Sequence, residues 1–319
     1  MIVVNELRQT ISIARISRAM DIHRSFIYYN RTEHSGKQKS RVSEGIETEI
    51  VKIATDRTTY GYRRIWAMLR NKDVKVNVKT VRRIMRRHNL ALPYAKHKNR
   101  TRERDLTKPD DINRLWETDI HYISTIREGM AYLMSIKDCF SRRWISYELS
   151  RSCTAKDCIM AVEKAYAERF PSSMPVKLIL RTDNGPQYIA GEFRSSMKIL
   201  DIGHEYIQKH TPEDNGDIES FHSSLKTDYI WVNDIETFED AKNLMEYAFT
   251  DYNTVRPHSS IDYLAPEAFE RRWNESHEFR EEFLEKRKIK HEREIRRREE
   301  KKRRLKENVS FEAGKSVQN

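Results

Sequence analysis

The stretch VKLILRTDNG, residues 176–185, decides the fold. Its first half, Val176 to Leu180, is a short continuous apolar run of the kind expected for a central strand buried on both faces. Its second half is polar and follows the carboxyl end of that strand. Because open α/β sheets place their functional groups at this edge, we expect Asp183 to lie in a functional site.

The segments on either side of this stretch predict a mixed α/β domain. Three β-rich segments come first, and turn signals at Glu128-Gly129 and Ser141 join them as antiparallel neighbours. Helical spacing then alternates with the apolar run and a further short strand. The predicted strands are 114–125, 131–136, 143–149, 176–180 and 204–207, and the predicted helices are 155–170, 193–200, 217–230 and 240–252.

Three short amphipathic helices, at 44–54, 60–69 and 78–88, precede this domain. The third exposes a row of cations, as does the recognition helix of a helix-turn-helix unit that enters a DNA major groove. These candidate DNA-binding residues are Lys79, Arg82, Arg83, Arg86 and Arg87. A solvated basic face on an ordinary three-helix bundle is the alternative interpretation.

The charge is segregated along the 319-residue chain, whose net charge is +11. Residues 1–110 hold 26 basic and 11 acidic side chains, residues 111–270 hold 17 and 27, and residues 271–319 hold 17 and 11. A basic head on an acidic middle favours nucleic acid as the partner of the head. A role of the charge in solubility alone would not predict this segregation.

Composition shifts predict five parts. These are an N-terminal helical segment (1–42), a helix-turn-helix DNA-binding domain (43–92), a basic linker (93–112), the α/β core with a C-terminal helix (113–275) and a charged helical tail (276–319). Within the tail, residues 278–307 predict one long solvated helix held by pairs such as Glu282 to Lys286. Residues 5–29 predict a small helical hairpin.

The sequence argues against a membrane-spanning protein and against a secreted protein. No apolar run approaches the roughly 18 to 20 residues that a membrane-spanning helix requires, and residues 1–30 lack a signal-peptide apolar region. We therefore expect a soluble, cytoplasmic protein that associates with the nucleoid. Cys139, Cys153 and Cys158 are odd in number and lack paired spacing, so they indicate neither a disulfide framework nor a zinc site.

Three acidic side chains lie where the α/β domain could gather them: Asp119 in the first strand, Asp183 after the apolar run, and Glu219 on the following helix. Mg²⁺ and Mn²⁺ are hard cations that take oxygen ligands and leave positions open for phosphate. Two such ions about 3.5 to 4 Å apart can assist in-line displacement at a phosphodiester. Each acid alone is more simply a surface charge or a helix cap.

The stretches that contain these acids resemble the DDE motif of the retroviral-integrase superfamily. They are WETDI at 116–120, TDNGPQY at 182–188 and TPEDNGDIESF at 211–221. Thirty-five residues separate Asp183 from Glu219, as in the D,D-35-E branch. Further matches point to insertion-sequence transposases of the two-reading-frame OrfB type. These matches are YGYRRIW at 60–66, Lys226, Tyr252-Asn253, Arg256-Pro257-His258-Ser259 and Pro266.

The resemblance implies an RNase H-like catalytic core, with a mixed five-stranded sheet flanked by helices, that cuts and joins DNA strands. Asp119, Asp183 and Glu219 would bind two Mg²⁺ ions, for which Mn²⁺ would substitute. Lys226 lies two helical turns beyond Glu219 on nearly the same face, so it would contact a DNA phosphate near the scissile bond. A surface lysine is the alternative for this residue.

The resemblance also implies partners and supporting residues. The partners would be double-stranded DNA at the element ends and target, a homo-oligomer on paired ends, and an upstream helix-turn-helix protein of the OrfA type. We expect His222 to hydrogen-bond or pack beside the acids, and Asn184 and Gly185 to form the turn that presents Asp183. Tyr188 would pack in a core or loop, with stacking on a base as the alternative.

Two other functions remain open at this point. The first is a catalytically inert DNA-binding regulator of a related element, which metal binding by the core would distinguish from an enzyme. The second is an RNase H-like nuclease or Holliday-junction resolvase, against which the basic helical head and the 35-residue spacing argue.

Overall fold

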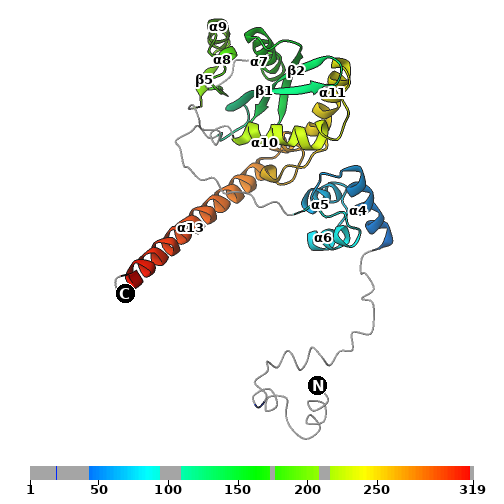
Figure 1. Cartoon of the computed structure of the whole chain (residues 1–319), viewed down its shortest axis with the longest axis vertical. Coiled ribbons are helices and arrows are strands. Elements are labelled where there is room, and N and C mark those ends of the chain that lie inside the picture. Colours follow the sequence, from blue (N-terminus) through cyan, green and yellow to red (C-terminus); the bar gives the residue numbers. More distant parts are fainter. Residues whose placement is uncertain (1–18, 20–42, 94–108, 173–176, 208–215, 317–319) are drawn as a thin grey trace. The chain divides into compact units, whose positions relative to one another are not determined.

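The structure, a computed structural model, describes residue 19 and residues 43–93, 109–172, 177–207 and 216–316, and Figure 1 labels their elements. The predicted hairpin at 5–29 therefore lies outside the described residues, apart from residue 19. The chain divides into two compact units, Met1–Glu49 and Ile50–Asn319. No helix among the described residues is long and apolar enough to cross a membrane.

Three short helices follow one another as predicted: α4 (Glu44–Asp56), α5 (Tyr62–Asn71) and α6 (Val78–Arg87). They bury an apolar side chain each at Ile50, Ile65 and Val81. The side chain of Asn77 caps α6 by accepting a hydrogen bond from the backbone N–H of Lys79 at 2.8 Å. Helix α6 therefore begins one residue before Lys79, the first cation of its basic face.

Five strands form one mixed sheet in the order β3-β2-β1-β4-β5. Their bounds are Leu115–Thr125 (β1), Gly129–Asp138 (β2), Trp144–Ser150 (β3), Ile179–Thr182 (β4) and Gly203–Tyr206 (β5). Strands β1, β2 and β3 pair antiparallel, whereas β4 is parallel to both β1 and β5. The predicted mixed sheet with its antiparallel strands first is confirmed.

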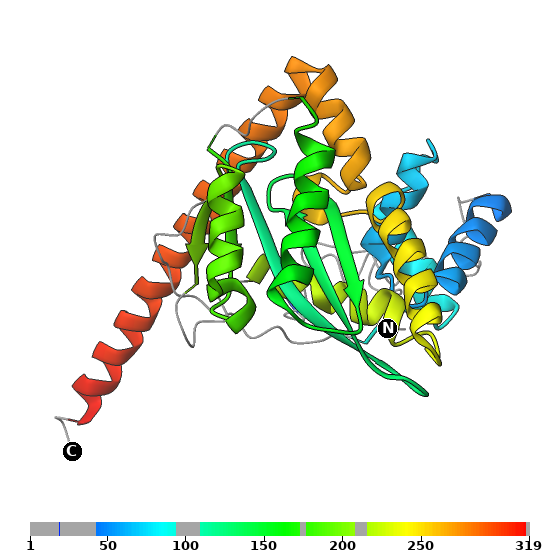
Figure 2. The same ribbon diagram turned by 90° about the horizontal axis from the view of Figure 1, so that it is seen from above.

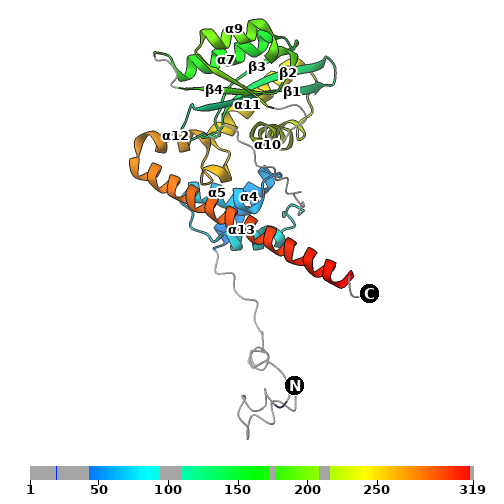
Figure 3. The ribbon, with the colours of Figure 1, turned by 90° about the vertical axis from the view of Figure 1, so that its left-hand side faces the viewer.

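Helices cover both faces of this sheet, as Figures 2 and 3 show. On one face lie α7 (Ala155–Arg169), α8 (Pro186–Ile189) and α9 (Gly191–Ile199), and on the other lie α10 (Gly216–Leu225) and α11 (Phe238–Thr254). Each face has its own apolar core, so the sheet is the middle of three layers.

The chain continues beyond the core through η3 (Ser259–Ile261) and α12 (Pro266–Glu275) into α13 (His277–Ser316). The predicted charged tail is one long helix, and its Glu282–Lys286 pair forms with 2.8 Å between the charged atoms. Sequence spacing missed α12. Four aromatic side chains join α12 and the start of α13 to the core: Phe140, Phe269, Trp273 and Phe283.

Two elements end at residues other than those that the sequence predicts. The apolar run predicts a strand ending at Leu180, but β4 continues through Thr182 because Arg181 and Thr182 are buried beside polar partners. The predicted helix 217–230 is α-helical only to Leu225, and a π-helix, η2 (Lys226–Ile230), completes it. Hydropathy alone detects neither change, because both depend on polar contacts between distant segments.

A buried amide completes the outer edge of the sheet. Asn253 on α11 accepts a hydrogen bond from the backbone N–H of Trp144 at 3.0 Å and donates one to its carbonyl at 2.8 Å. Both residues are almost fully buried. The amide of Asn253 thus makes the two hydrogen bonds that a further strand would make to Trp144, the first residue of β3.

We expect Asn253→Ala to lower the free energy of unfolding by about 2 to 4 kcal/mol, because it strands a buried N–H and a buried C=O. Urea titration followed by tryptophan fluorescence measures this loss. Asn274→Ala, at an exposed position on α12, is the control and should stay within about 0.5 kcal/mol of the unaltered protein. Equal stability of the two variants would contradict the prediction.

Candidate active site

Strand register brings Asp119 and Asp183 together. In the parallel β1–β4 pair, Glu117 lies opposite Arg181. Two residues further along the chain come Asp119, still in β1, and Asp183, just past the end of β4, and the charge of Asp119 acts on Asp183. Two acids that are 64 residues apart in the sequence thus become neighbours.

Asp183 is half-buried and directly follows β4. The backbone N–H of Gly185 donates to its Oδ1 at 2.9 Å. Burial raises the pKa of Asp183, and the nearby negative charge of Asp119 raises it further. Two carboxylates that repel each other form a site that a cation would stabilise.

Helix α10 faces these two acids. His222, on the buried face of α10, places its Nδ1 3.3 Å from Asp119 Oδ2. The ring of His121 lies beside it, with 5.0 Å between ring centroids. Burial and the charges of His222 and Lys226 lower the pKa of His121 to about 4. The predicted hydrogen-bonding role of His222 fits this geometry.

Glu219 and Lys226 lie on the same stretch of helix as His222, three residues before it and four residues after it. The helical repeat places these three side chains on one side of the helix. Lys226, the first residue of η2, is partly buried and lies within electrostatic reach of His121. Glu219 is exposed.

The predicted acids do not all lie within metal-binding distance of one another. Among the described residues, the three ligand atoms that lie within 4.8 Å of one another belong to Glu117, Cys139 and Asp217. Asp119, Asp183 and Glu219 do not form such a group. The structure therefore brings Asp119 and Asp183 together by register and leaves Glu219 on the adjacent helix.

The group around Glu117 is an ion-pair network that sequence reasoning missed. Arg181 Nη1 donates to Glu117 Oε1 at 2.9 Å, and Lys137 Nζ donates to the carbonyl of Asp217 at 3.1 Å. Arg142 also pairs with the carboxylate of Asp217. Cations already neutralise these acids, which argues against a metal here. One feature of the sequence pointed to Glu117: it lies two residues before Asp119 on a strand whose side chains alternate between the two faces, so both acids lie on the same face.

Burial and pairing set the charge of this network. Burial raises the pKa of Glu117 more than its neighbouring cations lower it. Burial would also raise the pKa of Asp217, but Lys137 and Arg142 outweigh it and lower that pKa. Asp217 is therefore an anion at the start of α10, where the helix dipole also favours negative charge.

The remaining predicted site residues occupy the surface or the core. The five cations of α6, Lys79, Arg82, Arg83, Arg86 and Arg87, are all exposed. Tyr188 is 1% exposed, and its hydroxyl lies 3.3 Å from that of Thr118. It packs in the core, so the stacking alternative for this residue is wrong.

Three family models match the chain. A model described as an integrase core domain matches residues 109–212, and a second integrase core model matches residues 200–266. An HTH-like domain matches residues 43–98. These ranges cover the helices α4 to α6, the sheet and the helices around it.

Curated relatives agree with these matches. The transposase for insertion sequence element IS904 of Lactococcus lactis is 30% identical over 256 residues, which cover 75% of this chain and 98% of that one. Transposase InsD of insertion element IS2 from Escherichia coli is 32% identical over 229 residues, covering 66% and 73%. The chain belongs to the insertion-sequence transposases of the DDE integrase superfamily, whose members are polynucleotidyl transferases with an RNase H-like core.

Solved structures also align with part of this chain. The simian T-cell lymphotropic virus intasome, solved with the PP2A regulatory subunit B56 gamma, aligns over 69% of this chain and 73% of that chain, with 19% identity and a TM-score of 0.43. The catalytic domain of Mos1 mariner transposase aligns over 43% and 70%, with 17% identity and a TM-score of 0.35.

We expect Gly185→Ala to disturb Asp183 without unfolding the core. A Cβ at Gly185 would lie 3.0 Å from Asp183 Oδ1, so the carboxylate must move. The contact requires a shift of a few tenths of an ångström; since a displacement of about 1 Å costs on the order of 100-fold in rate, we expect a loss of about 3- to 10-fold in a strand-cleavage assay on the variant. Gly191→Ala is the control, because no atom lies within 4 Å of its added Cβ. Wild-type cleavage by Gly185→Ala would contradict this role.

Proposed function

We propose that this transposase cuts and joins DNA strands at a site formed by Asp119, Asp183 and Glu219. The observation that supports the proposal is the parallel register of β1 and β4, in which Glu117 and Arg181, each two residues before one of the first two acids, lie opposite each other. The raised pKa of Asp183 supports it, because repulsion between close carboxylates is what a bound cation relieves. The substrates would be the DNA at the element ends and at the target.

The donor set of this site fits Mg²⁺. The three carboxylates offer oxygen ligands, as hard cations prefer, and Asp183 keeps one carboxylate oxygen outside its Gly185 hydrogen bond. Two Mg²⁺ ions, or Mn²⁺ in their place, would supply positive charge that activates the attacking oxygen and stabilises the leaving oxygen of the phosphodiester. Rotation or movement of Glu219 toward β1 would complete the ligand set.

The surrounding residues would orient the acids and the DNA. The Ile120 N–H donates to Asp119 Oδ1, His222 Nδ1 lies 3.3 Å from Asp119 Oδ2, and the Gly185 N–H donates to Asp183 Oδ1, so the protein orients both acids. Lys226 would place its ammonium on a phosphate near the scissile bond. We propose Asp119, Asp183, Glu219 and Lys226 as the catalytic residues on these grounds.

The arginine-rich face of α6 would bind duplex DNA. All five of its cations are exposed on one short helix, and helix-turn-helix units place such a helix in the major groove. Assembly would pair two element ends on a homo-oligomer, together with an upstream helix-turn-helix protein of the OrfA type. Acting on nucleoid DNA, the enzyme would work in the cytoplasm.

Removing a ligand should abolish the chemistry and spare DNA binding. We expect Asp119→Asn and Asp183→Asn to reduce Mg²⁺-dependent strand cleavage by roughly 1,000-fold or more, because metal stabilisation of the transition state contributes several kcal/mol. Titration with Mn²⁺, followed by electron paramagnetic resonance, should show weaker binding by both variants. Asp201→Asn, at an exposed position, is the control. Full Mn²⁺ binding by both site variants would refute the assignment.

The basic face of α6 can be tested separately. Each phosphate that Arg83 or Arg86 neutralises contributes about 0.9 to the slope of log K against log[salt]. We expect Arg83→Gln and Arg86→Gln each to reduce this slope by about that amount for a labelled duplex. Lys198→Gln, on α9, should leave the slope unchanged. A slope that neither α6 variant alters would count against DNA contact by this face.

A further inference from the structure

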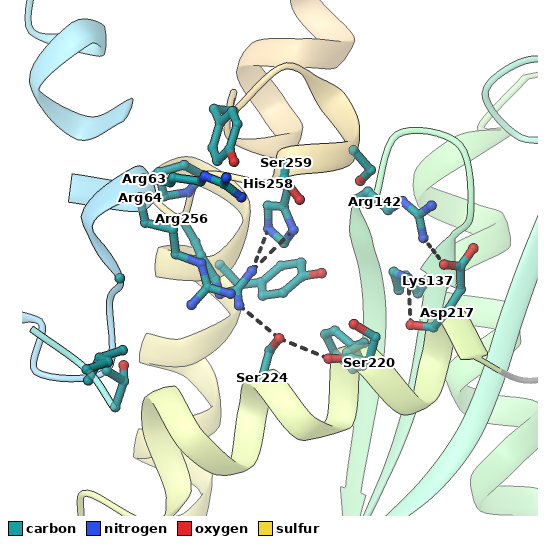
Figure 4. Close-up of a pocket in the computed structure, with 18 residues that line it drawn as sticks. Arg63, Arg64, Lys137, Arg142, Asp217, Ser220, Ser224, Arg256, His258 and Ser259 are labelled. Atoms are coloured by element: carbon teal, nitrogen blue, oxygen red, sulfur yellow. Dashed lines mark hydrogen bonds and ion pairs between the residues drawn. The ribbon is translucent and has the colours of Figure 1, made fainter. Parts of the chain in front are cut away.

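A cationic cavity of about 620 Å³ lies beside α10 (Figure 4), and Asp119, Asp183 and Glu219 are not among the residues that line it. It is lined by the start of α5, the α10 residues Ser220 and Ser224, the β2–β3 connection and residues 256–260. All of these segments belong to the unit Ile50–Asn319. Its charged lining consists of five cations, Arg63, Arg64, Lys137, Arg142 and Arg256, and one carboxylate, Asp217.

Some of these cations serve the fold itself. Arg256 donates to Asp228 at 2.9 Å and to Ser224 at 2.8 Å, and its side chain is 3% exposed. Arg64 also lies 3.5 Å from Asp228. These two arginines are paired, so they form the wall of the cavity and leave little hydrogen-bonding capacity for a ligand.

Other groups remain available to a ligand. Arg63 is exposed, and no ion pair is formed by it among the described residues; its guanidinium lies 5.6 Å from the ring centre of Tyr62. Ser259 and Ser260 are exposed and line the same cavity. Arg142 has a buried Nε without a hydrogen-bond partner within the described part of the chain. A ligand would therefore meet hydrogen-bond donors from the two serines and the positive charge of Arg63.

The cavity has a strongly positive potential. Burial lowers the pKa of His258 well below its usual value, and the charges of Arg256, Lys137, Arg64 and Arg142 lower it further. His258 therefore stays neutral, and its ring nitrogens lie 3.2 and 3.3 Å from Arg256 Nη1. The same cations line the cavity, and with a single carboxylate among the described lining residues they favour an anion over a cation there.

We propose that this cavity binds a backbone phosphate group of duplex DNA, with Arg63, Ser259 and Ser260 as its contacts. Ser220 and Ser224 lie on one side of α10 and line the cavity, whereas His222 lies on another side of the helix and faces Asp119. A helix with side chains is about 10 to 12 Å across, and duplex DNA carries one negative charge per about 1.7 Å of axis. A duplex bound at the candidate acids would therefore carry phosphates within about one helix diameter of the cavity.

The inference rests on the proposed DNA-cutting function, because it assigns a second point at which the same substrate is held. A phosphate group could also come from a free nucleotide. The observations favour DNA, since the cavity has one exposed arginine and two exposed serines, whereas of the described aromatic residues that line it Phe221 and Tyr252 are buried and Tyr263 is half-buried.

The first test measures binding of a labelled 30-base-pair duplex by the full chain in EDTA, at several salt concentrations. Arg63→Gln should weaken binding about 5-fold and reduce the slope of log K against log[salt] by about 0.9. Arg271→Gln, an exposed arginine on α12 that does not line the cavity, is the matched control. Wild-type affinity and slope for Arg63→Gln would overturn the proposal.

The second test locates the DNA. The thiol of Ser260→Cys should react with iodoacetamide several-fold more slowly when the duplex is present, whereas Ser195→Cys on α9 should react at an unchanged rate. The native thiols of Cys139 and Cys158 are buried, so mass spectrometry can follow the new site. Protection by ATP but not by duplex would overturn the proposal and assign a free nucleotide to the cavity.

The two proposals can fail separately. If the unaltered chain binds and cuts DNA while the duplex leaves Ser260→Cys unprotected, the cavity assignment is wrong and the proposed function stands. If the duplex protects Ser260→Cys but Asp119→Asn still cuts DNA at the normal rate, the catalytic assignment is wrong and the cavity assignment stands. A chain that binds no duplex would overturn both.

Discussion

Arg181 lies on the central parallel strand between carboxylates from its two neighbours. Its Nη1 donates to Glu117 of β1 at 2.9 Å, and its Nε donates to Glu205 of β5 at 2.7 Å. Removing one member of a buried ion pair leaves an unpaired charge and costs about 3 to 5 kcal/mol. These pairs hold the three parallel strands in one register, in which Glu117 and Arg181, two residues before Asp119 and Asp183, lie opposite each other. The positions of the candidate acids follow from a charge-pairing requirement in the sheet.

A second set of polar contacts places α10 against the sheet. Lys137 donates to the carbonyl of Asp217, and Arg142 pairs with its carboxylate, so the first turn of α10 is held by β2 and the connection that follows it. At the other end, the π-helix η2 carries Asp228, which pairs with Arg256. Single π-turns occur often at functional sites, and this one begins at Lys226. The helix that carries Glu219, His222 and Lys226 is thus fixed at both ends.

Several residues that match the transposase family after the core have structural roles here. Asn253 satisfies the backbone of Trp144, Arg256 pairs with Asp228, and His258 packs its ring against Tyr252 at 4.6 Å between centroids. Among the three, Arg256 and His258 also form a wall of the cationic cavity. Residues of a family motif can therefore both pack in the core and line a surface cavity, as Arg256 and His258 do here. Arg57, which directly follows α4, pairs with Asp251 on α11, with 2.9 Å between Arg57 Nη1 and Asp251 Oδ2.

The sequence alone determined the class of fold and most of its elements, although not α12, and it proposed the acids of the DDE motif as site residues. Apolar periodicity depends on neighbouring residues, so it predicted α4 to α6, the first three strands and the long charged tail. It could not predict that Arg181 and Thr182 belong to β4, that η2 interrupts the helix after Leu225, or that Glu117 and Lys137 are buried. Tertiary structure decided these features, because a polar side chain can be buried only beside a partner that folding brings from elsewhere in the chain.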